Sequence, residues 1–144
     1  MTLEQFIKQP SILREEIMNR REKLETLRVC SKQLTPYLSG MPKSMNLESR
    51  LERYVIRMDE LEREIEDLKA RKTLYNAELQ FLFSWVEEPN CRKVLIDHYI
   101  HFVPYNNLAS EMNYSESQIY RFRNKGLKEV EKYYREEESK MRVD

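Results

Sequence analysis

Apolar residues recur at alternating spacings of four and three over a long stretch of the chain that begins at Leu47. Of the twelve positions in this series, eleven are apolar and only Lys72 is charged. The residues between them are mostly charged, as in RMDELEREIEDLKARK (57–72). This repeat predicts one amphipathic helix from about Asn46 to Glu88, which Pro89 should end. The series consists of Leu47, Leu51, Tyr54, Met58, Leu61, Ile65, Leu68, Lys72, Tyr75, Leu79, Leu82 and Val86.

A second, shorter series lies upstream, at positions 13, 17, 20, 24, 27, 31 and 34, and five of these seven positions are apolar. It predicts a helix that Ser11 caps. Before it, Thr2 and Gln5 have the spacing of a capping box, so we expect a short first helix that Pro10 ends. The two prolines and the glycine of TPYLSGMPKSM (35–45) predict a loop.

A short loop between two such helices predicts that they fold back on each other as an antiparallel coiled-coil hairpin. The second helix is nearly twice as long as the first, so the part of its apolar face from Leu74 to Val86 needs another partner. The C-terminal part of the chain, the short first helix or a second subunit could supply it.

Composition favours an all-α fold. The chain of 144 residues holds only two glycines and 35% charged residues, whereas sheet folds need frequent glycines in their turns. Basic and acidic residues number 25 each, so the net charge indicates no polyanionic partner, and a nucleic-acid site would need local clustering of charge. We expect two domains, a helical coiled-coil region at 1–88 and a second domain at 89–144.

The segment LASEMNYSESQIYRFRNKGLKEV (108–130) has the pattern of a helix–turn–helix unit. Such a unit needs a small residue where its helices cross, then a residue that tolerates the left-handed conformation, then a helix cap. Ala109, Asn113 and Ser115 occupy these places, and Ile119 supplies a buried branched side chain after the cap. A helix predicted from Cys91 to His101 would be the third helix against which the unit packs. The remaining core positions are expected to be filled by Leu108, Met112, Tyr114 and Phe122.

The second helix of this unit has two different faces. Four basic residues and no acidic residue occur between Gln118 and Lys128, in contrast to the mixed charge elsewhere. This clustering favours contact with a polyanion over a merely solvated surface. The residues expected to face inward are Ile119, Phe122, Leu127 and Val130. Those expected to face outward are Glu116, Ser117, Tyr120, Arg121, Asn124 and Lys128.

From CRKVLIDHYI (91–100) through LKEVEKYY (127–134) the chain resembles region four of bacterial sigma factors. Within that class it is similar to phage-encoded sigma-like regulators of the RinA and ArpU kind. The likeness extends more loosely over 36–88, including the MPKS turn at Met41–Ser44. It implies promoter-type DNA recognition and control of phage genes, often the activation of late genes. The chain departs from ordinary region four at Glu116 and Ser117, where sigma factors usually carry basic residues.

The same resemblance implies which residues contact double-stranded DNA. Arg121 could donate two hydrogen bonds to a guanine edge, and Gln118 or Asn124 could pair with adenine. Lys125 and Lys128 are placed for phosphates. Host RNA polymerase and a second copy of the chain are further candidate partners. The implied contact residues are Ser115, Ser117, Gln118, Tyr120, Arg121 and Asn124, together with Lys125 and Lys128.

No enzymatic or cofactor site is predicted. Cys91, His98 and His101 lack a fourth ligand at a recognised zinc spacing, and no nucleophilic side chain has a neighbouring base. Glycine occurs only at positions 40 and 126, so there is no glycine-rich phosphate loop. The aromatic side chains of Tyr75 and Trp85 are expected to pack in the core.

The two cysteines belong to no paired motif, which favours free thiols and a reducing compartment. No apolar run approaches the roughly 18 residues that span a membrane, and the N-terminus has no signal-peptide pattern. We therefore expect a soluble protein of the bacterial host cytoplasm. Two alternatives to a transcriptional regulator stay open. One is a small-terminase-like subunit that recognises DNA for packaging, and the other is a protein-interaction adaptor that does not bind DNA.

Overall fold

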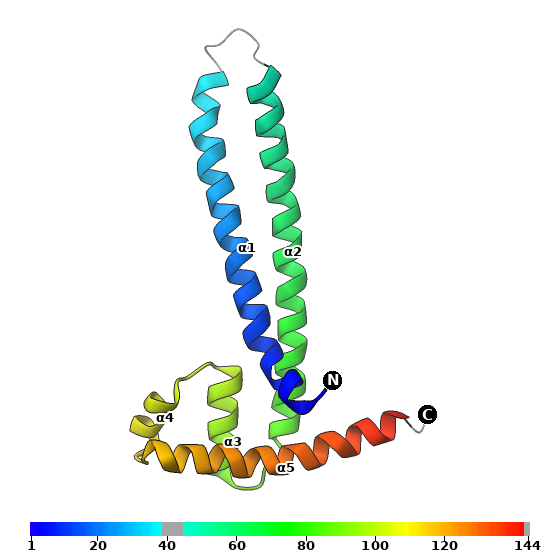
Figure 1. Ribbon diagram of the computed structural model, residues 1–144, viewed down its shortest axis with the longest axis vertical. Helices are drawn as coiled ribbons and strands as arrows, with labels where there is room; N and C mark the ends of the chain where they lie inside the picture. Colours follow the sequence, from blue (N-terminus) through cyan, green and yellow to red (C-terminus); the bar gives the residue numbers. More distant parts are fainter. Residues whose placement is uncertain (39–44, 143–144) are drawn as a thin grey trace. The chain divides into compact units, whose positions relative to one another are not determined.

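The computed structural model describes residues 1–38 and 45–142, and all regular elements of this part are helices (Figure 1). The prediction of an all-α protein is confirmed. None of the helices in the described part combines the length and the apolar character that crossing a membrane requires. The elements are α1 (Leu3–Leu38), α2 (Met45–Phe83), α3 (Pro89–Leu95), the π-helical segment η1 (Ile96–Ile100), α4 (Tyr105–Met112) and α5 (Glu116–Arg142).

Packing divides the chain into two units. The first unit comprises Met1–Ile12 and the described residues from Lys72 onward, and the second comprises Leu13–Arg71. These units differ in extent from the domains expected at 1–88 and 89–144. The reason is that the last turns of α2 and the first turns of α1 contribute to the same apolar core as the C-terminal helices.

The capping box at the start of α1 is confirmed. The backbone N–H of Thr2 donates to Oε1 of Gln5 at 3.0 Å, and the backbone N–H of Gln5 donates to Oγ1 of Thr2 at 3.2 Å. The two bonds satisfy N–H groups that would otherwise lack a partner at the helix start.

The prediction that Pro10 ends a first helix and Ser11 caps a second is wrong, because α1 continues through both residues. A proline inside a helix removes one backbone hydrogen bond and costs about 3 kcal/mol. Leu3 and Ile7 before the proline are each only 6% exposed, and Leu13 after it is 5% exposed. Because burial of each such side chain stabilises by about 1.5–3 kcal/mol, packing outweighs the proline.

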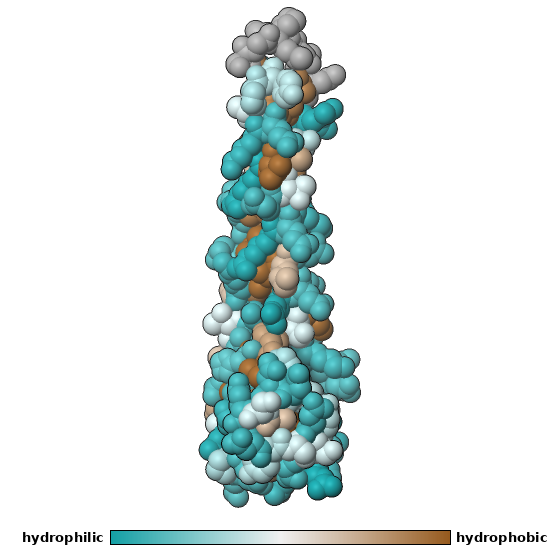
Figure 2. Space-filling view, turned by 90° about the vertical axis from the view of Figure 1, so that its left-hand side faces the viewer, coloured by the Kyte–Doolittle hydropathy of each residue, from teal (hydrophilic) through white to brown (hydrophobic). Residues whose placement is uncertain are grey.

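In the second unit, α1 and α2 run side by side in opposite directions (Figure 1). Every position of the two predicted apolar series within this unit is buried or half-buried. Leu61 of α2 is 1% exposed, and Leu13, Ile17 and Leu24 of α1 are each 5% exposed. Figure 2 shows apolar side chains along this part of the chain, bordered by hydrophilic ones. The spacing of four and three therefore located the contact faces of both helices.

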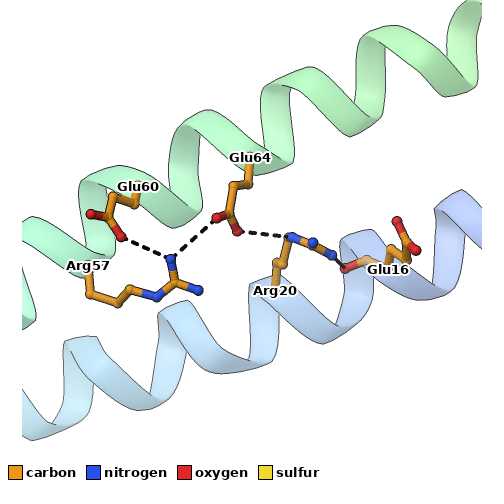
Figure 3. A network of polar contacts seen from close by, with 5 residues as sticks. All are labelled: Glu16, Arg20, Arg57, Glu60 and Glu64. Atoms are coloured by element: carbon orange, nitrogen blue, oxygen red, sulfur yellow. Dashed lines mark hydrogen bonds and ion pairs between the residues drawn. The ribbon is translucent and has the colours of Figure 1, made fainter.

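Figure 3 shows an ion pair that joins the two helices of the second unit, beside ion pairs that Arg57 forms within α2. Nε of Arg20 on α1 donates to Oε2 of Glu64 on α2 at 3.0 Å. Nη1 of Arg57 donates to Glu60 at 3.0 Å and to Glu64 at 3.3 Å. These hydrogen bonds, led by the one from Arg20, lower the pKa of Glu64. Arg20 occupies a position of the apolar series, and its charge is tolerated there because Glu64 pairs with it.

The ends of α1 and α2 differ from the predicted ones. Residues 35–38 belong to α1 instead of the loop, and the MPKS turn at Met41–Ser44 lies outside the described residues. α2 ends at Phe83, short of the expected Glu88. Beyond it, backbone bonds of the tighter i to i+3 kind close the last turn, at 3.3 Å from Trp85 to Leu82 and 3.1 Å from Val86 to Phe83.

Pro89 does not end α2. It stands instead at the first turn of α3, with Glu88 in an extended backbone conformation before it. Proline suits this place because the missing N–H would have no partner inside the helix. Pro89 therefore marks a helix boundary, as predicted, but it begins α3 instead of ending α2.

The core of the first unit includes most of the apolar face between Leu74 and Val86, the part of α2 for which the sequence predicted a partner without identifying it. Leu79 and Val86 are fully buried among residues of the C-terminal helices and of the first turns of α1. The chain thus supplies two of the three proposed partners itself. Leu74, at the start of the segment, is 60% exposed and stays outside this core. The core residues with no exposed surface are Leu79, Phe83, Val86, Cys91, Val94, Leu95, Leu108, Ile119 and Val130.

A close approach at Gly126 holds α5 against α3. A Cβ atom at this position would lie 2.8 Å from Cδ1 of Leu95 and 3.4 Å from Cβ of Cys91. Leu95 is fully buried, so its side chain would have to shift within a close-packed core to make room for that Cβ. Glycine costs about 1 kcal/mol in a helix interior relative to alanine, and here it permits the packing that fixes the position of α5.

Candidate nucleic-acid interface

The chain reverses between α4 and α5 through a left-handed residue. Asn113 has φ 59° and ψ 40°, the conformation expected for it from the sequence. The backbone N–H of Tyr114 bonds to the carbonyl oxygen of Ala109 at 3.1 Å, which closes the end of α4. Ala109 itself is only 9% exposed, in agreement with a small residue at a helix contact.

Ser115 caps α5, as the sequence predicts. Its Oγ accepts a hydrogen bond from the backbone N–H of Gln118 at 3.2 Å. Four residues after the cap, Ile119 is fully buried, and Phe122 is 7% exposed. The cap therefore fixes where α5 begins and which of its faces turns inward. The inward residues expected from the sequence are Ile119, Phe122, Leu127 and Val130, and all are buried or half-buried.

Tyr114 is the exception among the predicted core residues of this unit. It is 41% exposed, so its assignment to the core is wrong. Its ring meets the ring of Phe122 edge-on at 5.0 Å, and its hydroxyl accepts a hydrogen bond from Nδ2 of Asn90 at 3.2 Å. The polar end of a tyrosine favours this half-exposed place, where the hydroxyl keeps a partner and the ring still packs.

The helix predicted from Cys91 to His101 forms as α3 followed by the π-helical segment η1. α5 packs against both α3 and α4. At the end of η1, Nδ1 of His98 lies 2.9 Å from the carbonyl oxygen of Val103, which can only accept a hydrogen bond. α3 and α4 thus support the inward face of α5, and its opposite face is left to solvent.

The predicted contact residues do lie on that solvent face. Seven of the eight are exposed and Gln118 is half-buried. At 100° per residue, Ser117, Arg121, Asn124 and Lys128 fall within one narrow stripe of α5. The eight residues are Ser115, Ser117, Gln118, Tyr120, Arg121, Asn124, Lys125 and Lys128.

The four cations of the basic run have unequal roles. Arg121 and Lys128 are exposed and form no ion pair within the described part of the chain. Lys125 instead lies with its Nζ 2.7 Å from Oε2 of Glu88. Arg123 points inward, where its Nη1 donates to the hydroxyl of Tyr105 at 3.3 Å. Only two of the four side chains are therefore available to an anion without first leaving a partner.

Arg123 also supports Tyr120, one of the predicted contacts. Its guanidinium lies 5.0 Å from the ring centre of Tyr120 and 5.4 Å from that of Tyr105. Tyr105 in turn stacks on His98 with ring centres 3.7 Å apart. This column of rings and cation restrains the side chain of Tyr120 at the edge of the exposed face. Glu88 and Tyr105 were not identified from the sequence, because both lie far from α5 along the chain.

The side chains on this face carry hydrogen-bonding groups and positive charge. An exposed arginine can donate two parallel hydrogen bonds, and exposed amides can both donate and accept. Within the described residues, no group of three or more histidine, cysteine, aspartate or glutamate side chains could hold a metal ion. The surface therefore offers hydrogen bonds and positive charge to a polar, anionic partner.

Comparisons with known proteins add nothing to this geometry. No family model, no curated protein and no solved structure matches the chain. The resemblance to region four of sigma factors therefore stays a prediction from the motifs of the sequence.

Proposed function

We propose that the protein is a sequence-specific DNA-binding transcriptional regulator in which α4, the turn at 113–115 and α5 form a helix–turn–helix unit. The observation that carries this proposal is the left-handed backbone of Asn113 between α4 and the cap of α5 at Ser115. This conformation lets the chain turn sharply from the short α4 into the much longer α5, whose first turns carry the exposed contact residues.

In this proposal α5 enters the major groove of DNA, which is about 12 Å wide and admits one helix. Arg121 reads a guanine edge, and Asn124 or Gln118 reads an adenine. Lys128 contacts a phosphate, and Lys125 does so after leaving Glu88. Tyr120 is held in place for contact by Arg123.

The regulatory role rests on the resemblance of the sequence to phage sigma-like regulators. It makes the protein an activator of phage late genes, with host RNA polymerase as a further partner. The two antiparallel helices of the second unit act in this proposal as a coiled coil for assembly or for contact with polymerase. The ion pair from Arg20 to Glu64 supports a fixed register between them.

A selection experiment tests the proposal without knowledge of the operator. Purified protein is incubated with a pool of random DNA duplexes, and the bound duplexes are amplified and sequenced over several rounds. We expect one enriched sequence motif. The motif should be lost with Arg121→Ala and kept with Arg63→Ala, which removes an exposed arginine of the second unit.

One observation favours the adaptor as a second candidate. Two of the four cations of the basic run are already engaged, by Glu88 and by Tyr105. If the selection enriches no motif and wild type binds random duplexes no better than the Arg121→Ala variant, the adaptor is the better description.

A further inference from the structure

A groove on the first unit lies away from the residues assigned to DNA. Its volume is about 560 Å³, which is within the range of ligand-binding sites in proteins. α2 forms one wall with Phe81 and Leu82, the C-terminal half of α5 forms the other with Tyr134, and Phe6 of α1 also lines it. The groove is thus built from three helices of one compact unit.

Aromatic side chains shape this groove and leave a large apolar surface in solvent. Phe81 is 55% exposed and Trp85 is 47% exposed, although the sequence placed Trp85 in the core. Trp85 lies beside the groove and not among its lining residues: its ring meets that of Phe81 edge-on at 5.9 Å and packs on Tyr133 at 5.3 Å. Phe6 lies 5.8 Å from the ring of Tyr134. These contacts hold the rings in position, so the groove exists before any partner binds.

The charged residues that line the groove are all acidic. Glu78 of α2 and Glu137 and Glu138 of α5 line it, and none of its described lining residues is basic. Lys140 approaches Glu137 only at 3.9 Å, and both side chains are at least half exposed. An exposed pair this far apart neutralises little of the charge of Glu137, so the groove keeps most of its negative potential.

We propose that this groove docks an amphipathic helix of a partner protein that carries large apolar residues on one face and Lys or Arg on both sides of that face. An apolar groove between two helices accepts the apolar side chains of such a segment, spaced three and four residues apart. The carboxylates on both walls pair with the flanking cations. This surface is separate from the DNA-contact face of α5 and does not depend on the proposed function.

Charge decides against two other occupants. In a symmetric dimer through this groove, the same patch of both copies would meet, and the three carboxylates of each copy would come together. A membrane surface rich in anionic lipids would likewise be repelled. Exposed aromatic rings inside an acidic rim therefore select for a cationic partner.

Two matched peptides test the proposal. Each has about 18 residues, or five helical turns, with leucines on one face; the remaining positions are lysine in one peptide and glutamate in the other. Neither contains tryptophan, so Trp85, the one tryptophan of the chain, reports binding through its fluorescence. We expect the lysine peptide to bind one per chain with saturation, more weakly as salt is raised, and the glutamate peptide to bind at least about tenfold more weakly.

Variants of residues that line the groove locate the binding. Phe81→Ser and the pair Glu78→Lys with Glu138→Lys should each weaken the lysine peptide about tenfold or more, and the charge-reversed protein should gain affinity for the glutamate peptide. Glu52→Lys, on the exposed face of α2 in the second unit, is the control and should change nothing. Equal binding of both peptides, binding unchanged in the groove variants, or no binding would overturn the proposal. So would a dimer of the protein alone that Phe81→Ser dissociates, because the occupant would then be a second copy.

Discussion

Nζ of Lys125 lies 2.7 Å from Oε2 of Glu88, so a carboxylate just before α3 holds one of the cations assigned to DNA phosphates. The hydrogen bond from Lys125 lowers the pKa of Glu88, and the same bond raises the pKa of Lys125. Both groups are therefore charged near neutral pH. A DNA phosphate has to compete with Glu88 for this ammonium group.

Glu88→Gln should strengthen DNA binding by releasing Lys125. We expect a gain on a selected duplex and on a scrambled one alike, because a phosphate contact carries no sequence information. The logarithmic salt dependence should steepen by about 0.9 if one more phosphate is neutralised. Fluorescence anisotropy at several salt concentrations measures both the affinity and its salt dependence. Glu87→Gln is the matched control, and an equal gain there would attribute the effect to net charge instead of to the pair.

The turn between α4 and α5 should depend on the left-handed backbone of Asn113. Asn113→Val should destabilise the first unit by roughly 1–3 kcal/mol, because a β-branched residue resists this conformation. Asn113→Gly should be about as stable as wild type, since glycine adopts positive φ without strain. Urea unfolding compares the three proteins. Equal stability of the valine variant would show that the turn does not need this backbone.

Two leucines of α2, five residues apart, should differ widely in how much the same substitution destabilises the protein. Leu79 is fully buried in the core of the first unit, whereas Leu74 is 60% exposed. Leu79→Asp should cost about 4 kcal/mol or more, because it buries a charge without a partner. Leu74→Asp should change stability by no more than about 0.5 kcal/mol. A folded Leu79→Asp protein with wild-type stability would contradict the described core, and urea unfolding monitored by circular dichroism decides between the outcomes.

His98 should make stability depend on pH. Burial, the largest cause, lowers its pKa below the ordinary 6.5, and the nearby Arg123 acts in the same direction while the bond to Val103 opposes it. Between the lowered pKa of His98 in the folded protein and its ordinary pKa of 6.5 in the unfolded chain, the unfolded chain therefore binds more protons than the folded one. Stability is therefore complete above 6.5 and declines as pH falls through that interval.

Thermal melting between about pH 7.5 and about pH 5.5 measures this dependence. His98→Gln should flatten it relative to wild type, and His101→Gln should not, because His101 is exposed and only these two histidines occur in the chain. An identical pH dependence in all three proteins would assign the effect to other groups.

Features set by neighbouring residues were predicted from the sequence, and features set by distant contacts were not. The capping box of Thr2 and Gln5 and the cap at Ser115 depend on residues three apart, so the pattern alone located them. The left-handed Asn113 also follows from the identity of one residue. The apolar spacing located the buried faces of α1 and α2, since a helix carries one face along its whole length.

The errors have the opposite cause. The continuation of α1 through Pro10 depends on the burial of Leu3 and Ile7 in a core built mostly from the other end of the chain. The ion pair between Lys125 and Glu88, which the sequence did not predict, joins residues 37 apart in sequence. The end of α2 at Phe83 was likewise not marked by the apolar series, which continues to Val86. No local pattern contains these relationships.

A salt titration of three proteins on two duplexes tests most directly whether α5 reads DNA. Wild type, Arg121→Ala and Lys128→Ala are each bound to a duplex from the selection and to a scrambled one. We expect Arg121→Ala to lose about 1–3 kcal/mol on the selected duplex and little on the scrambled one. We expect Lys128→Ala to weaken both duplexes equally and to reduce the salt slope by about 0.9. Identical curves for all three proteins would contradict DNA recognition by α5.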